Sequence, residues 1–112
     1  MISALHQFKA EFFKALGHPV RLAILDALRQ GEQSVSRLAE ELGLEQPSVS
    51  QQLAVLRQRG LVIARKEGTT VHYRIADPQV YVFLDLGRAI FERHLKSQSN
   101  QLSALQEGLS RS

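Results

Sequence analysis

The residues best suited to chemistry in this chain are small and amide side chains that lie between apolar ones after position 45. Val49, Leu53 and Leu56 recur at helical spacing, so we expect them to face a core. The side chains left outward carry uncharged hydrogen-bond donors and acceptors, which suits them to read the edges of DNA bases. On composition alone, they fit a purely solubilising helix face equally well. These outward residues are Gln46, Ser48, Ser50, Gln51 and Gln52.

Positive charge is concentrated in the same part of the chain. Residues 46–76 hold five cationic side chains against the single acid Glu67, a net charge of +4. Residues 1–45 sum to −1 and residues 77–112 to zero, so the whole-chain charge of +3 is local in origin. Such a segment indicates a surface that faces a polyanion, the alternative being a solvated charged face. The five cations are Arg57, Arg59, Arg65, Lys66 and Arg74.

Glycine and proline divide the chain into the elements that would position these residues. A capping residue or a proline starts each helical pattern, and a glycine ends it. Ser34, for example, is a good N-cap for the pattern that Gly43 closes. The sequence therefore predicts helices over about residues 3–16, 19–30, 35–42 and 47–59.

After the fourth helix, the apolar period changes from helical to alternating. Residues 61–64 and 71–75 are strand-like runs, and the polar stretch 66–70 between them contains a glycine. This arrangement predicts a β-hairpin with its turn over 66–70. Alternation along the second run places His72 and Arg74 on one face.

The last part of the chain predicts a long helix followed by a polar tail. Asp77 and Pro78 form a helix-start signal, and apolar residues at helical spacing follow to about residue 96. We expect one domain over residues 1–96 and a tail over 97–112 that is either a frayed end or a helical extension. The tail is rich in Ser, Gln and Asn but keeps helical spacing at Leu102, Leu105 and Leu109.

The helices over 35–42 and 47–59, with Gly43 at the bend, match the helix-turn-helix signature. The second helix of such a unit lies in the DNA major groove and reads bases there. Arg57, toward its far end, is better placed for phosphates. A basic hairpin directly afterwards can act as a wing on the phosphate backbone or in the minor groove. Its candidate contacts are Arg65, Lys66, Thr69, Thr70 and His72.

Three segments carry a family resemblance: residues 13–25, residues 48–56 with 60–62, and residues 68–73. In this order they are similar to the opening signature, the recognition helix with its wing entry, and the wing of the ArsR-type winged-helix repressors of bacteria. The resemblance covers about residues 8–95. It implies a mainly α-helical winged helix-turn-helix fold with one small β-hairpin. It also implies a homodimer that represses promoters at imperfect inverted repeats of double-stranded DNA, usually until an effector releases it.

Two further features follow from the resemblance. Gln52 stands where many members have His, so this chain would bind DNA with different preferred bases. The first and last helices form the dimer interface in the family, and here they carry more large apolar residues than a small core needs. The implied interface residues are Leu5, Phe8, Phe12, Phe83, Phe91 and Leu95.

The family's usual metal sites are not expected in this chain. Without Cys it lacks the ligands of the arsenic, cadmium and lead sensors. The zinc and nickel pattern on the last helix, if His94 belonged to it, would need ligands at Tyr81, Phe83 and Ser97, which cannot serve. We therefore expect no cofactor. His6 and His94 remain the candidates for an unusual metal site, against the plainer interpretation of partly exposed histidines.

Other classes of protein find little support in the sequence. No Gly-rich phosphate loop opens a helix, which argues against a nucleotide-dependent enzyme. No apolar stretch approaches a membrane span, and no signal-peptide pattern starts the chain, so a cytoplasmic protein without a membrane partner is expected. The sequence therefore predicts a non-enzymatic, sequence-specific transcriptional regulator that acts as a homodimeric repressor. The alternative is a winged-helix protein-interaction module without an operator of its own.

Overall fold

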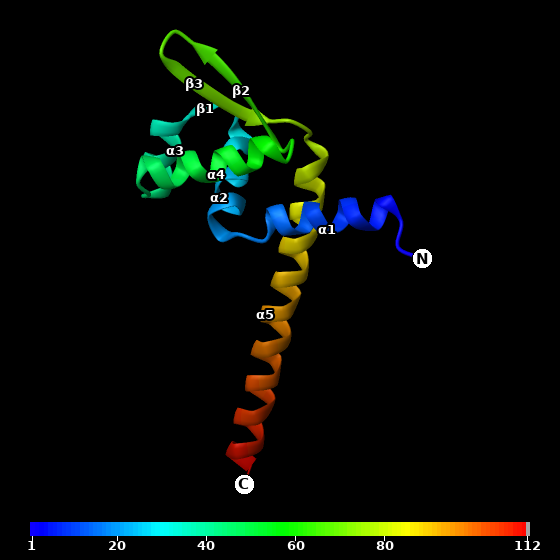
Figure 1. The fold of residues 1–112 in the computed structure, drawn as a ribbon. Coiled ribbons are helices and arrows are strands. Elements are labelled where there is room, and N and C mark those ends of the chain that lie inside the picture. Colours follow the sequence, from blue (N-terminus) through cyan, green and yellow to red (C-terminus); the bar gives the residue numbers. More distant parts are fainter. Residues whose placement is uncertain (112) are drawn as a thin grey trace. The chain divides into compact units, whose positions relative to one another are not determined.

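The computed structural model describes the backbone of residues 1–111 and the side chains of residues 1–108. The chain divides into two compact units, the first over Met1–Asp77 and the second from Pro78 onward. Helices dominate, with one small sheet in the first unit (Figure 1). In chain order the elements are α1 (Ala4–Leu16), α2 (Pro19–Ala27), the 3-10 turn η1 (Leu28–Gln30), β1 (Gln33–Ser34), α3 (Val35–Leu42), α4 (Gln46–Gln58), β2 (Val62–Glu67), β3 (Thr70–Ile75) and α5 (Gln79–Arg111).

Local capping fixes the helix boundaries of the first unit. The Ser3 hydroxyl accepts from the His6 amide at the start of α1, and His18 Nδ1 accepts from the Val20 amide at the start of α2, each at 3.2 Å. The Ser34 hydroxyl accepts from the Arg37 amide at 3.3 Å and so caps α3, as expected from its residue type. Gly43 ends α3 at φ +66°, a left-handed conformation that favours glycine. Pro19 and Ser34 therefore marked the starts of α2 and α3 correctly, whereas the helix predicted over 19–30 ends as α2 at Ala27 and is followed by the 3-10 turn η1.

The sheet differs from the prediction in two ways. Its strand order is β1-β3-β2, and all pairs are antiparallel. The predicted turn over 66–70 is wrong, because pairing continues to Glu67 opposite Thr70 and leaves a two-residue connection with Gly68 at φ +63°. The third strand, β1, was not predicted; it is two residues long and places Ser34 opposite His72. His72 is consequently half-buried, whereas Arg74 on the same strand is exposed.

The core of the first unit fixes the position of α4. Seven large apolar side chains are less than 2% exposed, and three of them lie on the inner side of α4. No polar or charged residue within 1–108 is buried. The helix is therefore held by apolar packing against its neighbours, while its opposite face stays in solvent. The seven residues are Ile24, Leu25, Leu28, Leu38, Val49, Leu53 and Leu56.

The second unit is one long helix, α5, and residues 97–111 continue it. Of the three leucines with helical spacing in this stretch, Leu102 and Leu105 are exposed, and Leu109 lies outside the residues whose side chains are described. Neither α5 nor any other helix in the described part of the chain is apolar enough over a sufficient length to cross a membrane.

Candidate nucleic-acid interface

The exposed face of α4 carries four of the five side chains proposed to read bases. Gln46, Ser48, Ser50 and Gln51 are all exposed, although Val49 between them has no exposed surface. A helix turns about 100° per residue, so Gln51 lies nearly opposite the buried positions Val49, Leu53 and Leu56, at the centre of the outward face. This face offers uncharged donors and acceptors on a rigid support.

Gln52, the fifth predicted reader, has a protein partner. Its Oε1 accepts a hydrogen bond of 2.8 Å from Nε of Arg21 on α2, and both side chains are half-buried. Gln52 lies on the flank of α4 that faces α2, so it is not equivalent to Gln51. The contact joins residues 31 positions apart in the chain, and the sequence pattern did not indicate it.

The two arginines near the end of α4 have different surroundings. Arg57 is exposed and forms no ion pair within the described side chains. Arg59, which follows the helix, pairs with Glu11 of α1 at 2.7 Å between Nη1 and Oε2. Arg57 is thus the cation at this end of α4 that remains available for a phosphate.

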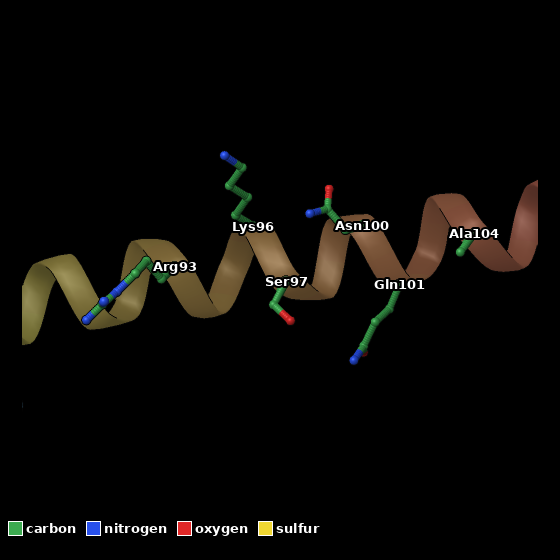
Figure 2. Close-up of a pocket in the computed structure, with 6 residues that line it drawn as sticks. All are labelled: Arg93, Lys96, Ser97, Asn100, Gln101 and Ala104. Carbon is green, nitrogen blue, oxygen red and sulfur yellow. The ribbon is translucent and has the colours of Figure 1, made fainter.

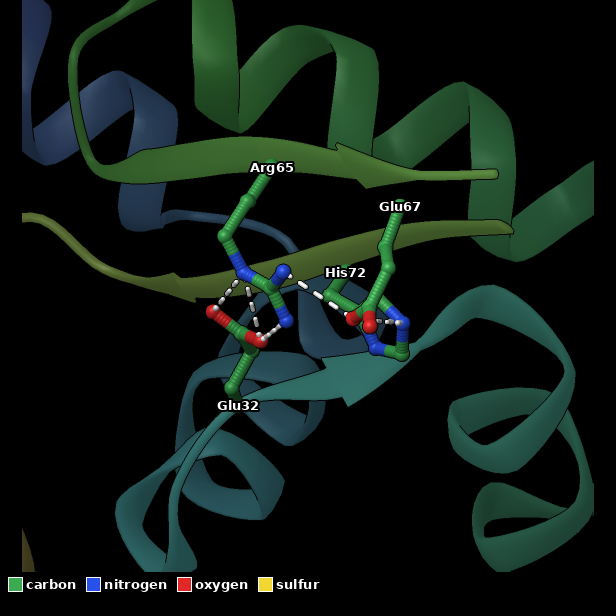
Figure 3. A network of polar contacts seen from close by, with 4 residues as sticks. All are labelled: Glu32, Arg65, Glu67 and His72. Carbon is green, nitrogen blue, oxygen red and sulfur yellow. Dashed lines mark hydrogen bonds and ion pairs between the residues drawn. The ribbon is translucent and has the colours of Figure 1, made fainter. Parts of the chain in front are cut away.

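In the hairpin, Arg65 lies between two carboxylates (Figure 3). Its Nε donates to Glu32 Oε1 at 3.1 Å, and its Nη1 donates to Glu67 Oε2 at 3.0 Å. His72 Nε2 lies 3.9 Å from the same Glu67 oxygen. The hydrogen bond from Arg65 lowers the pKa of Glu32 despite the opposing effect of burial, and the two carboxylates raise the pKa of Arg65.

This cluster reduces the positive charge that the hairpin presents to solvent. Glu67 is already included in the +4 calculated for residues 46–76, but Glu32 is not, so this sum overstates by one the positive charge around the hairpin. Glu32 precedes β1 and lies 33 positions from Arg65, outside the segment whose charge was counted. Lys66, Thr69 and Thr70 remain exposed around the turn.

The Glu32–Arg65 contact predicts a specific pH dependence of stability. Because the pKa of Glu32 is lowered on folding, the contribution of the contact is complete above the ordinary glutamate value of 4.5 and is lost as the pH falls through the folded value. We expect Glu32→Gln to be slightly less stable than wild type at about pH 7, with the difference vanishing once the pH falls below the folded pKa of Glu32. Urea denaturation at several pH values measures it, with Glu41→Gln on α3 as the matched control. A difference that is independent of pH would contradict this account.

The described side chains contain no cluster of three or more His, Asp or Glu suited to a metal ion. Nδ1 of His6 accepts from the Ser3 amide at 3.1 Å in the cap of α1, so one of its ring nitrogens is engaged. His94 lies exposed on α5.

A hollow of about 430 Å³ runs along α5. Figure 2 shows that its lining comes from a single helix, with side chains pointing to different sides. A small-molecule site normally surrounds most of its ligand, which one helix cannot do. The hollow therefore lacks the enclosure of a ligand site. Its lining residues are Arg93, Lys96, Ser97, Asn100, Gln101 and Ala104.

Of the six residues predicted to form a dimer interface, three lie on α1 and three on α5, and five of them are exposed in the single chain. Phe8 is 67% exposed and Phe91 is 58% exposed. Phe12 is half-buried, with its ring stacked on that of Phe8 at 6.2 Å between centroids. Large apolar side chains that are exposed together on one helix are typical of interaction surfaces. The remaining members, Leu5, Phe83 and Leu95, are exposed as well.

Comparison with known proteins gives consistent results. The family described as "Bacterial regulatory protein, arsR family" matches residues 18–64, from the start of α2 into β2. An uncharacterized HTH-type transcriptional regulator of Mycobacterium tuberculosis, Rv0081, is 41% identical over 105 residues, which cover 93% of this chain and 92% of the relative. A biofilm growth-associated repressor of Agrobacterium fabrum is 42% identical over 82 residues, 73% of this chain and 70% of the relative.

Solved structures give the same result. The solution structure of a homodimeric winged helix-turn-helix DNA-binding domain from Mycobacterium bovis, a possible ArsR-family regulator, is 40% identical, with a TM-score of 0.73 over 83% of this chain and 86% of that one. The fold prediction is thus confirmed: the first unit is a winged helix-turn-helix, with α3 and α4 as the two helices and β2–β3 as the wing. Together with the extent of the sequence identity, these matches show that the chain belongs to the ArsR family of bacterial transcriptional regulators.

Proposed function

We propose that the protein is a homodimeric repressor that binds an imperfect inverted repeat in double-stranded DNA. The observation that carries this proposal is the outward face of α4, where Gln51 and its exposed neighbours project from a helix whose inner side is fully buried. A rigid helix with uncharged donors and acceptors on its outer side is what major-groove readout requires. Two copies related by a two-fold axis would read two half-sites.

The proposed phosphate contacts are the cations that form no ion pair within the described side chains. Arg57 and Lys66 are exposed at the end of α4 and on the wing, and Thr69 and Thr70 can add hydrogen bonds there. Arg65 contributes less than its charge alone suggests, because a phosphate must compete with Glu32 and Glu67 for its guanidinium. His72, half-buried behind the wing, is the weakest of the proposed contacts.

A titration with duplex DNA tests the division between base readers and phosphate contacts. We expect Gln51→Ala to reduce discrimination between a selected site and random DNA about tenfold, since a good base contact contributes about 1–3 kcal/mol. We expect Lys66→Ala to weaken binding to all sequences alike and to flatten the slope of log affinity against log salt by about one unit.

Gln58→Ala, which removes the same amide near the other end of α4, is the control for the first variant. If Gln51→Ala discriminates as well as this control does, the assignment of α4 as the reading helix is wrong. A protein-interaction module is the alternative function, and its binding to DNA would show no sequence preference in any variant. The steep salt dependence of phosphate contacts would also be missing from its binding to a protein partner.

A further inference from the structure

One guanidinium group connects three helices of the first unit. Arg21 on α2 donates from Nε to Gln52 Oε1 on α4 at 2.8 Å. Its Nη1 donates to the carbonyl oxygens of Ala15 at 3.1 Å and of Lys14 at 3.4 Å, in the last turn of α1. Arg21 and Gln52 are both half-buried. The position of the Gln52 amide is therefore set by backbone atoms of α1 through the side chain of Arg21.

The chemistry of the pair fixes the orientation of the amide. A guanidinium has only donors, so Gln52 must turn its carbonyl oxygen toward Arg21. Because the amide is planar, its NH₂ group then points away from Arg21. Within the described side chains and backbone, Nε2 of Gln52 donates to no protein group. The residue thus keeps two donor hydrogens for a partner outside the protein, while its acceptor is engaged.

We infer that Arg21 makes Gln52 a donor-only contact to DNA, which favours guanine over adenine at the base pair that it faces. This inference rests on the proposed function and adds a specificity rule to it. A glutamine that reads adenine needs both its oxygen, for the N6 amino group, and its nitrogen, for N7. Guanine presents two acceptors, O6 and N7, in the same groove and suits an NH₂ group alone. Arg21 is a positioning residue that acts through Gln52.

Selection of random duplex DNA by the 112-residue chain tests this inference, with the selected sequences counted for each variant. Gln52→Met keeps the size of the side chain and removes the amide. The position whose preference it abolishes is the one that Gln52 reads. At that position we expect the wild type to select guanine. We expect Arg21→Met, which frees the carbonyl oxygen, to raise the adenine-to-guanine ratio about tenfold while the preferences at other positions stay unchanged.

Gln52→Glu separates this role from a purely structural one. Glutamate keeps an acceptor for Arg21, and the pair becomes charge-assisted, so the link between α2 and α4 is retained. It has no donor, however, and we expect it to lose the guanine preference. This variant also covers the case in which Arg21→Met fails to fold, which thermal unfolding by circular dichroism would reveal.

Each remaining outcome is decisive. Retained guanine preference in Gln52→Glu, or an adenine-to-guanine ratio within about twofold of wild type in folded Arg21→Met, overturns the inference and leaves the DNA-binding function intact. A wild-type chain that selects no sequence overturns the proposed function itself, and the inference with it.

Discussion

We expect Leu53→Ala to lower the free energy of unfolding by about 3 kcal/mol at neutral pH. Leu53 has no exposed surface and lies on the inner side of α4 together with Val49 and Leu56, which are also fully buried. Truncation removes buried methyl groups and leaves a cavity that the surrounding helices fill only in part. For a small domain, this loss is a large fraction of the total stability.

Urea denaturation followed by circular dichroism measures the effect. All variants must be compared at one protein concentration, because dimerisation would make the midpoint depend on concentration. Gln51→Ala is the matched control: it lies two residues earlier on the same helix, is exposed, and should stay within about 0.5 kcal/mol of wild type. A loss below about 1 kcal/mol for Leu53→Ala would mean that α4 is not held by its buried face.

The contrast between these two variants bears on function as well as on stability. Base readout requires side chains held in place before the DNA arrives, because ordering them on binding costs free energy. The buried side of α4 provides that support, since Leu53 cannot move without opening the core. Leu53→Ala should therefore weaken DNA binding through the fold, whereas Gln51→Ala should change base preference without changing stability.

The helices could be predicted from sequence because their boundaries depend on neighbouring residues. Ser34 and Gly43 act within one turn of the helix ends that they cap, and the buried positions of α4 follow from spacing alone. The wing was predicted as a hairpin for the same reason. Its turn was placed wrongly because Lys66 and Glu67 are polar residues that lie in an exposed strand, where polarity does not distinguish strand from loop.

The features that the sequence did not predict depend on contacts between distant parts of the chain. β1 has only two residues and exists because β3 offers it a free edge, so no local pattern reveals it. The partners of Gln52 and Arg65 are likewise 31 and 33 positions away. Residue types can show that a side chain is able to bind DNA. Whether it is already engaged within the protein depends on the fold.

The second large effect concerns self-association. We expect Phe91→Asp to convert a dimer into a monomer at micromolar concentration. Phe91 is 58% exposed on α5, and Leu86, Ile90 and Leu95 nearby are also exposed. Burying a phenylalanine contributes about 1.5–3 kcal/mol, and a symmetric dimer contains the residue twice. Losing that burial and placing two carboxylates there should weaken dimerisation at least about 100-fold.

Size-exclusion chromatography with light scattering measures the change. Asn100→Asp is the control, because it adds the same charge on α5 about half a turn around the helix from Phe91. We expect this control to remain dimeric. A Phe91→Asp protein that also remains dimeric would place the interface away from this part of α5.

DNA binding provides an independent readout of the same substitution. In a dimer, contact of one reading helix with its half-site raises the effective concentration of the second helix at the other half-site, which typically strengthens binding by about 10²–10⁴. A monomer loses that gain and keeps the contacts of its own α4 and wing. We therefore expect Phe91→Asp to bind a full inverted repeat only as tightly as a single half-site, with half-site affinity equal to that of wild type. A parallel loss at the half-site would instead show that the substitution disturbs the reading helix, since dimerisation contributes nothing to binding there.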